Sequence, residues 1–337
     1  MPARFDASNC PVPAWLPEGH SQTIYGARLA IHHRASFTRE RVETPDGDFI
    51  DLDWAVPGPS RIPDPACTAL GQGPALALFH GLEGSSLSPY AQSIAHHFRA
   101  RGWTVVIPHF RGCSGTPNRL PRAYHSGDSD EIAFMLDTVR ARLPQARWHA
   151  AGISLGGNAL AKYLGERGTA ASGLTAAAAV SAPLDLTAGG HTLGRGFVNR
   201  QVYTRMFVRT LRAKVLDKAR RFPGVFDVVG VANAQDLYEF DDAYTAPQHG
   251  FANVADYWSR ASALPWLRGI TVPTLVLNAR NDPFLPARFL PGPWDASDAV
   301  LLHQPAHGGH AVFPCGHVRP HLHWLPRRLE RFFQDGS

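Results

Sequence analysis

One serine of the chain stands between glycines, where an apolar stretch gives way to a helical pattern. The motif is Gly-Ile-Ser-Leu-Gly over residues 152–156, and its serine is Ser154. A Gly-x-Ser-x-Gly turn between a strand and a helix is typical of a nucleophilic serine, because glycines tolerate the strained turn that exposes the hydroxyl. The alternative is a turn that serves packing alone, since glycine-rich strand-to-helix turns occur in many folds. The rest of the chain must therefore supply partners for the serine.

A serine nucleophile needs a base that takes its proton and a third group that orients the base. Asp282 follows a predicted apolar strand, and His310 comes 28 positions later, after another short apolar run. Gly308 and Gly309 permit the sharp loop that a reaching imidazole requires. The order serine, acid, histidine is the one found in hydrolases with this turn. We therefore predict Ser154, Asp282 and His310 as a catalytic triad.

Other residues compete for two of these roles. Asp185 follows the preceding strand and is an alternative acid, although its Pro-Leu-Asp-Leu setting is less typical of a loop. His303, His307 and His317 lie near His310 in the sequence. A histidine taken at random is more often a surface or supporting residue than a general base.

Acyl transfer also needs two N–H groups for the oxyanion of the tetrahedral intermediate. One is predicted to come from Leu155, directly after the nucleophile. The other is predicted to come from Leu82, in the loop Phe-His-Gly-Leu-Glu-Gly-Ser-Ser that follows the first buried strand. We interpret His80 in this loop as a structural histidine rather than as a base or ligand.

The elements that must position these residues alternate along the chain. Predicted strands alternate with predicted helices, which indicates a mostly parallel, doubly wound sheet. Together with the serine turn, this sheet is the arrangement expected of the α/β-hydrolase fold. The expected strands lie in 74–81, 103–112, 147–154, 174–186 and 270–282, followed by a short apolar run at 299–303, and the expected helices lie in 88–102, 126–144, 155–168 and 321–334. Residues 37–56 predict an opening hairpin around a Pro-Asp-Gly turn.

This rhythm also divides the chain. Residues 1–40 have little periodicity and are predicted to form an N-terminal arm over the surface. The strand–helix alternation stops across 187–265, which we predict to be a helical cap inserted over the sheet. The hydrolase core would then comprise residues 41–186 and 266–337.

The predicted cap contains a basic helix over residues 205–221, with seven basic residues and one acidic residue. Phe207, Leu211 and Val215 share one face of it. Two interpretations are open: a solvated helix packed by its apolar face, or a helix attracted to anionic phospholipid surfaces. Further aromatic residues of this part of the chain either line an acyl pocket or only pack the cap; they are Phe251, Tyr257, Trp258 and Trp266.

Composition excludes several classes of protein. The chain of 337 residues is 44% hydrophobic and carries a net charge of +5, without the basic tail or lysine block typical of nucleic-acid binding. Its cysteines, Cys10, Cys67, Cys113 and Cys315, form no C-x-x-C pair. His317, His321 and His323 lack a carboxylate context for a metal site. No signal peptide or long apolar span is evident, so we expect a cytoplasmic protein. The chemistry predicted for the triad needs neither a metal nor a cofactor.

Several segments together resemble one family, the YheT-type α/β-hydrolases. They are Phe79–Gly115, Tyr124–Ile132, Gly152–Glu166, Tyr238–Trp258 and Asn278–Pro286, in an order that extends from the Gly-His-Ser-Gln-Thr-Ile-Tyr-Gly segment near residue 20 to the C-terminus. The family is the bacterial counterpart of the eukaryotic abhydrolases that cleave acyl esters of lipids. The resemblance implies the same triad, Ser154, Asp282 and His310.

The sequence therefore predicts a serine hydrolase for small-molecule carboxylic esters, either short-chain or lipid acyl esters. Two alternatives remain: a noncatalytic ligand-binding protein on the same scaffold, and an acyltransferase that uses the same triad. An intact nucleophile, acid and base argue against simple binding, because binding needs none of them. The sequence leaves hydrolysis and acyl transfer undistinguished.

Overall fold

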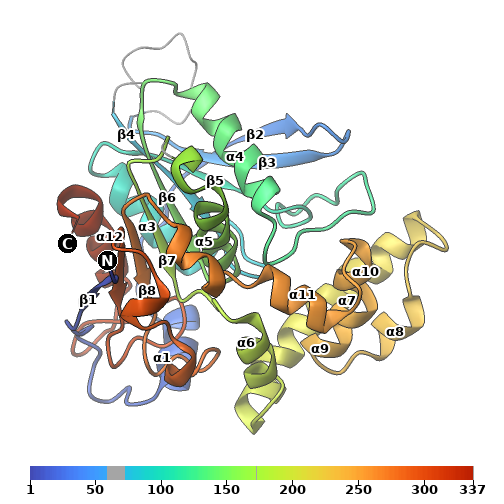
Figure 1. The fold of residues 1–337 in the computed structure, drawn as a ribbon. Helices are drawn as coiled ribbons and strands as arrows, with labels where there is room; N and C mark the ends of the chain where they lie inside the picture. The colour runs from blue at the N-terminus through green and yellow to red at the C-terminus, as the bar shows by residue number, and fades with distance from the viewer. Residues whose placement is uncertain (59–72, 172, 337) are drawn as a thin grey trace.

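A single mixed sheet runs through the protein. The computed structural model describes residues 1–58, 73–171 and 173–336, and within them nine strands are joined edge to edge (Figure 1). Seven of these strands, in the spatial order β1-β9-β8-β7-β6-β4-β5, pair in parallel fashion. Beyond β5, strand β3 pairs with β5 and β2 pairs with β3, both antiparallel. This mostly parallel sheet confirms the predicted fold class. In spatial order the strands are β1 (Arg4–Asp6), β9 (Val300–His303), β8 (Thr274–Leu277), β7 (Ala176–Val180), β6 (Arg147–Ile153), β4 (Pro74–Phe79), β5 (Thr104–Pro108), β3 (Phe49–Ala55) and β2 (Thr38–Glu43).

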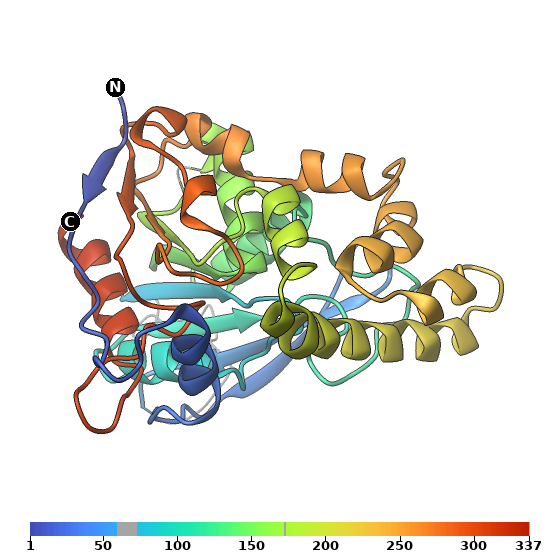
Figure 2. The same ribbon diagram turned by 90° about the horizontal axis from the view of Figure 1, so that it is seen from below.

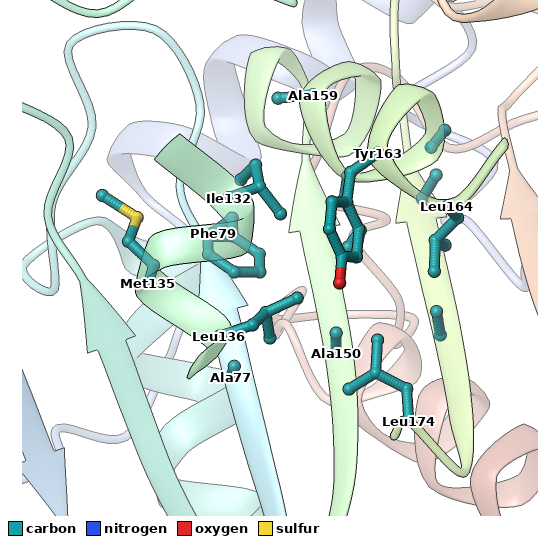
Figure 3. Packing of buried hydrophobic residues seen from close by; sticks show 14 of the residues in the cluster. Ala77, Phe79, Ile132, Met135, Leu136, Ala150, Ala159, Tyr163, Leu164 and Leu174 are labelled. Atoms are coloured by element: carbon teal, nitrogen blue, oxygen red, sulfur yellow. The ribbon is translucent and has the colours of Figure 1, made fainter. Parts of the chain in front are cut away.

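Helices cover both faces of this sheet. The pleat of β4 sends Ala75, Ala77 and Phe79 to one face and Leu76 and Leu78 to the other, which explains why its sequence is apolar throughout. The first face packs against α4 (Ser129–Arg142) and α5 (Leu155–Arg167), and the second against α3 (Pro89–Arg99) and α12 (Trp324–Asp335). Figure 3 shows the first layer, with side chains of both helices pointing onto the strands. The sheet is therefore covered by packed helices on both faces at β4 and β6.

Between β7 and β8 the chain leaves the sheet and is largely helical. Most of these helices extend away from the strand ends, as both views show (Figures 1 and 2), whereas the last of them packs back against α5 (Leu155–Arg167). They are α6 (Leu186–Leu193), the π-helix η2 (Asn199–Thr204), α7 (Arg205–Arg221), α8 (Val228–Asn233), α9 (Leu237–Phe240), the π-helix η3 (Asp241–Thr245), α10 (Ala246–Gln248), α11 (Val254–Ala261) and the 3-10 helix η4 (Leu264–Gly269). The division of the chain at 187 and 265, with these helices as one cap, stays a prediction.

The first forty residues contain more regular structure than their sequence suggests. Strand β1 adds an edge to the sheet beside β9, and α1 (Gly19–Arg28) packs under the C-terminal loops. A strand of three residues is too short to show periodicity, and α1 has only a weak apolar face. The predicted hairpin is present as β2 and β3.

Three cysteines, Cys10, Cys113 and Cys315, are buried free thiols, whereas Cys67 lies outside the described residues. In the part of the chain that the structure describes, no helix is both long enough and apolar enough to cross a membrane.

Candidate active site

Ser154 sits on the sharp turn between β6 and α5. Its φ and ψ angles are 54° and −121°, a conformation that costs free energy for a residue with a side chain. The turn is held by the Ser154 N–H, which donates to the carbonyl of Val180 on the neighbouring strand at 2.8 Å. The sheet thus presents the hydroxyl at the carboxyl ends of its central strands, where α/β folds place their ligands.

The glycines around the serine are required by close approach of backbone segments. A Cβ on Gly152 would lie 2.2 Å from the carbonyl oxygen of Gly156, and one on Gly156 would lie 2.5 Å from that of His80. Either side chain would force α5 away from the sheet. These two positions therefore exclude any side chain.

His310 and Asp282 meet Ser154 from two other loops. The Nε2 of His310 lies 2.9 Å from the Ser154 hydroxyl, and its Nδ1 lies 2.8 Å from Oδ2 of Asp282. With the proton on Nδ1, this ring donates to the carboxylate and accepts from the serine. The other carboxylate oxygen of Asp282 accepts the N–H of Phe284 at 2.8 Å, and the Phe284 ring stacks on the imidazole at a centroid distance of 4.0 Å. The imidazole is fixed on two sides.

The N-terminal segment holds the histidine loop in place, a role that the sequence analysis missed. The Thr23 hydroxyl accepts the N–H of His310 at 2.9 Å, and the Gln22 side chain accepts the N–H of Gly308 at 2.9 Å. Gln22 is fully buried, and Gly19 lies so close to Asn281 that a Cβ would stand 1.8 Å from its carbonyl oxygen. Helix α1 therefore buttresses the loops of both the acid and the base. The only sequence signal was the Gly-His-Ser-Gln-Thr segment within the family resemblance, which gave it no function.

In the loop after β4, most backbone N–H groups donate to neighbouring groups. The N–H of Gly81 donates to the Tyr90 hydroxyl and that of Glu83 to the Tyr124 hydroxyl, both at 2.9 Å, while Gly84 N–H closes a turn onto the Gly81 carbonyl. The N–H of Leu82 donates to no acceptor within the described part of the chain, and neither does that of Leu155 at the start of α5. Both residues line the cavity that contains Ser154.

His80 anchors this loop from below. Its Nδ1 donates to the Gly81 carbonyl at 2.8 Å, and its Nε2 accepts the N–H of Phe110 at 3.1 Å. Burial lowers the pKa of His80 to about 3, so the ring is neutral. This geometry is that of a positioning histidine, as we interpreted it from the sequence.

A buried carboxylate connects the same loop to α7. Glu83 adopts a φ of 55°, and its carboxylate accepts from the Tyr124 hydroxyl at 3.0 Å and from the Lys214 ammonium at 2.8 Å. Lys214 belongs to α7, so one ion pair joins this helix to the loop that carries the free Leu82 N–H.

A cavity of about 490 Å³ opens above Ser154 between the sheet and the helices that follow β7. Ser154 and His310 form part of its wall, and most of the remaining lining is apolar. The apolar side chains from the inserted helices and the adjoining loops include Leu186, Leu193, Phe207, Leu211, Val215, Phe240, Tyr257, Trp258 and Phe284. Tyr257 and Trp258 thus both line the cavity and pack within the buried cluster around α11.

Two ionisable groups in this lining are altered by burial. The pKa of Asp241, whose carboxylate accepts from Thr245 at 2.6 Å and from the Trp258 indole at 2.8 Å, is raised to about 6. The pKa of Lys218 is lowered to about 8, with its ammonium donating to the carbonyls of Pro121 and Arg122. The cavity is therefore mostly apolar with a few fixed polar groups, as is usual for a small-molecule site.

The competing residues lie in other environments. Asp185 caps α6, its carboxylate accepting the N–H of Ala188 at 2.9 Å. His303 is fully buried beside Arg328 and Asp6, and His307 contacts Asn281. His317 is on the surface.

Comparison with known proteins gives a consistent picture. Residues 74–316 match the family model of the alpha/beta hydrolase fold. The chain is 36% identical to YheT of Escherichia coli K12, which is named as a candidate esterase, over 96% of this chain and 89% of YheT. It is 28% identical to human ABHD3, named a phospholipase, over 98% of this chain and 82% of ABHD3.

Solved structures are similar in fold at low sequence identity. Est1E from Butyrivibrio proteoclasticus, whose structure contains ferulic acid, superimposes with a TM-score of 0.54 at 12% identity, covering 88% of this chain and 98% of Est1E. DcsB, solved with a substrate analogue, gives a TM-score of 0.56 at 14% identity, covering 90% of this chain and all of DcsB.

Proposed function

Because the chain belongs to the α/β-hydrolase fold family, we propose that it is a serine hydrolase that cleaves carboxylic esters. The observation that carries this proposal is the continuous hydrogen-bonded chain from the Ser154 hydroxyl through His310 to Asp282. The names of the relatives, an esterase in one case and a phospholipase in another, support hydrolysis as the reaction class.

In the proposed reaction, Nε2 of His310 takes the proton of Ser154 as Oγ attacks the carbonyl carbon of the ester. Asp282 keeps the imidazole in the tautomer that can accept this proton and stabilises the imidazolium that results. The tetrahedral intermediate then expels the alcohol, which receives the proton from His310. Water, deprotonated by the same imidazole, attacks the acyl-enzyme, and collapse of the second intermediate returns the proton to Ser154 and releases the acid.

The negative oxygen of each intermediate is assigned to the N–H groups of Leu82 and Leu155. Their lack of protein acceptors supports this assignment, because a donor already paired within the protein would have to break a bond to serve. Tyr90, Tyr124 and His80 hold the loop of Leu82 in place before substrate arrives.

The cavity favours an ester with an apolar acyl group. Side chains such as Leu193, Phe207 and Phe284 offer it no hydrogen bonds, so burial of hydrocarbon would supply most of the binding free energy. We therefore assign short-chain or lipid acyl esters as the substrate class.

Purified protein and p-nitrophenyl esters of graded acyl length test this function. We expect turnover that peaks at an acyl length fitting the cavity and that is absent in Ser154→Ala. Product analysis with added alcohols distinguishes hydrolysis from acyl transfer. Saturable ester binding without turnover, and without labelling by a fluorophosphonate, would indicate a noncatalytic binding protein instead.

A further inference from the structure

The segment between α6 and the first turns of α7 has an exposed apolar surface. Phe197 is 81% exposed, and Val202 and Met206 are 43% and 42% exposed. Val202 and Met206 are four residues apart on one continuous helical path, and Phe197 is the first residue of that path. Single exposed apolar residues are ordinary, but three within ten residues form a surface that needs an explanation. We call residues 195–209 the cap tip.

Exposed arginines alternate along the sequence with these apolar residues. The chain contains no Asp or Glu between Asp185 and Asp217. Within the described residues, no carboxylate is within ion-pair distance of any exposed arginine of the tip; these are Arg195, Arg200, Arg205 and Arg209. The tip therefore has a positive charge that the protein itself does not neutralise.

Basic residues elsewhere on α7 are partnered. Lys214 pairs with Glu83, Arg212 donates to the carbonyl of Ala234, and Arg220 pairs with Asp217 at 3.0 Å. Among the basic residues of α7, those with neither an ion pair nor a hydrogen bond to another described residue are Arg205 and Arg209, at the end that also exposes apolar side chains. A helical segment that lies in a lipid headgroup layer needs both exposed apolar side chains and unpaired positive charge.

The opposite side of the same segment faces the cavity. Leu193, Phe207 and Leu211 line it, and Tyr203 and Val208 are buried. Figure 1 shows this segment, from α6 into the start of α7, projecting away from the sheet at the bottom of the view. A surface bound to the tip would therefore lie about one helix diameter, roughly 10 Å, from the cavity wall.

We propose that the cap tip docks the protein on an anionic phospholipid surface. Phe197, Val202 and Met206 enter the headgroup layer, and the arginines of the tip bind lipid phosphates. This docking needs no catalytic step, so it stands or fails separately from the proposed ester hydrolysis.

Co-sedimentation with vesicles tests the proposal, in a Ser154→Ala background so that lipid cleavage cannot interfere. We compare vesicles of phosphatidylglycerol and phosphatidylcholine with vesicles of phosphatidylcholine alone, at low and high salt. We expect binding to the anionic vesicles that weakens with salt and little binding to the neutral ones. Phe197→Ser, and separately the double change Arg200→Gln with Arg205→Gln, should weaken partitioning roughly tenfold.

Two matched variants control for general effects of lost apolar area or charge. Trp294→Ser removes an aromatic side chain that is 75% exposed, beside the acidic residue Asp295, and Arg220→Gln removes a charge from α7 outside the tip. Both should bind vesicles as the Ser154→Ala parent does. In the active enzyme, the tip variants should hydrolyse a soluble short-chain ester at the normal rate.

Three results would overturn the docking proposal. They are absence of binding to anionic vesicles at low salt, binding that the tip variants leave unchanged, and a dimer in sedimentation velocity that Phe197→Ser dissociates while vesicles are not bound. The last result would show that a second copy of the chain covers the tip.

Discussion

Asp282 and Asp185 both follow strands of the sheet, but their carboxylates accept hydrogen bonds from different groups. Asp282 receives the Nδ1–H of His310, whereas Asp185 caps the backbone of α6. Asp282→Asn keeps the size of the side chain but favours the wrong imidazole tautomer, so we expect turnover to fall by about 10⁴. Asp185→Asn should retain most activity, since asparagine also caps helices well. Steady-state kinetics of the two variants provide the check, and the reverse ranking would assign the acid to Asp185.

Thr23 is the residue whose role the sequence concealed. Thr23→Val keeps the shape of the side chain but leaves the buried His310 N–H without an acceptor. We expect a loss of about 1–3 kcal/mol in the free energy of unfolding and a lower kcat. Thr210→Val is the matched control, because the Thr210 hydroxyl only bonds the preceding turn of an exposed helix. Urea unfolding measures both, and equal effects at the two sites would contradict the buttressing role.

At the scale of elements, α7 reaches the loop of Leu82 through a single ion pair. Lys214→Met would leave the Glu83 carboxylate buried without its cation, and the loop would relax away from the orientation that serves the oxyanion. Removing an oxyanion donor outright costs 10²–10³ in kcat, so a displaced donor should cost roughly tenfold. Binding of a short soluble ester does not depend on this pair, so its KM should change little.

Two further variants isolate this effect. Lys214→Arg should restore most of the rate, because it restores the positive charge. Lys162→Met, which removes the pair with Glu166 on the surface of α5, should leave kcat unchanged. A Lys214→Met enzyme with normal kcat would show that the ion pair only holds α7 against the loop and does not orient the Leu82 N–H.

The sequence predicts the elements that carry local patterns and misses those that depend on distant contacts. The turn at Ser154, the alternation of strands and helices and the order of the three site residues are all local or sequential signals. The two hydrogen bonds from α1 to the histidine loop span sequence separations of 286 and 287 residues, and no local pattern in the sequence predicts them. The link from Lys214 to Glu83 was missed for the same reason, since charge alone did not reveal which of seven basic residues pairs with that carboxylate.

At the scale of the whole molecule, buried histidines should make the fold sensitive to acid. Burial lowers the pKa of His80 and of His125 to about 3 each, from the ordinary value near 6.5. Between these values the unfolded chain binds protons that the native protein does not, so stability falls as the pH decreases below about 6.5. Each of these two histidines should remove roughly 1 kcal/mol from the free energy of unfolding between pH 7.5 and 5.5.

Asp241 acts in the opposite direction, because its raised pKa lets the native protein take up a proton near pH 6. Its smaller contribution within this range should not reverse the trend. Urea unfolding at pH 7.5 and 5.5 measures the combined effect of these groups on the free energy of unfolding. His317→Gln, at an exposed position, should leave the change between the two pH values as it is in the wild type. Equal stability at pH 7.5 and 5.5 would be inconsistent with neutral buried histidines.

The central claim is that Ser154 is the nucleophile, and covalent labelling tests it most directly. Trypsin releases residues 148–162 as one peptide in which Ser154 is the only hydroxyl-bearing residue. After incubation with a fluorophosphonate, we expect mass spectrometry to find one adduct per molecule, located on this peptide, and neither adduct nor ester hydrolysis in Ser154→Ala. An adduct on a different peptide, or wild-type turnover in Ser154→Ala, would contradict the account.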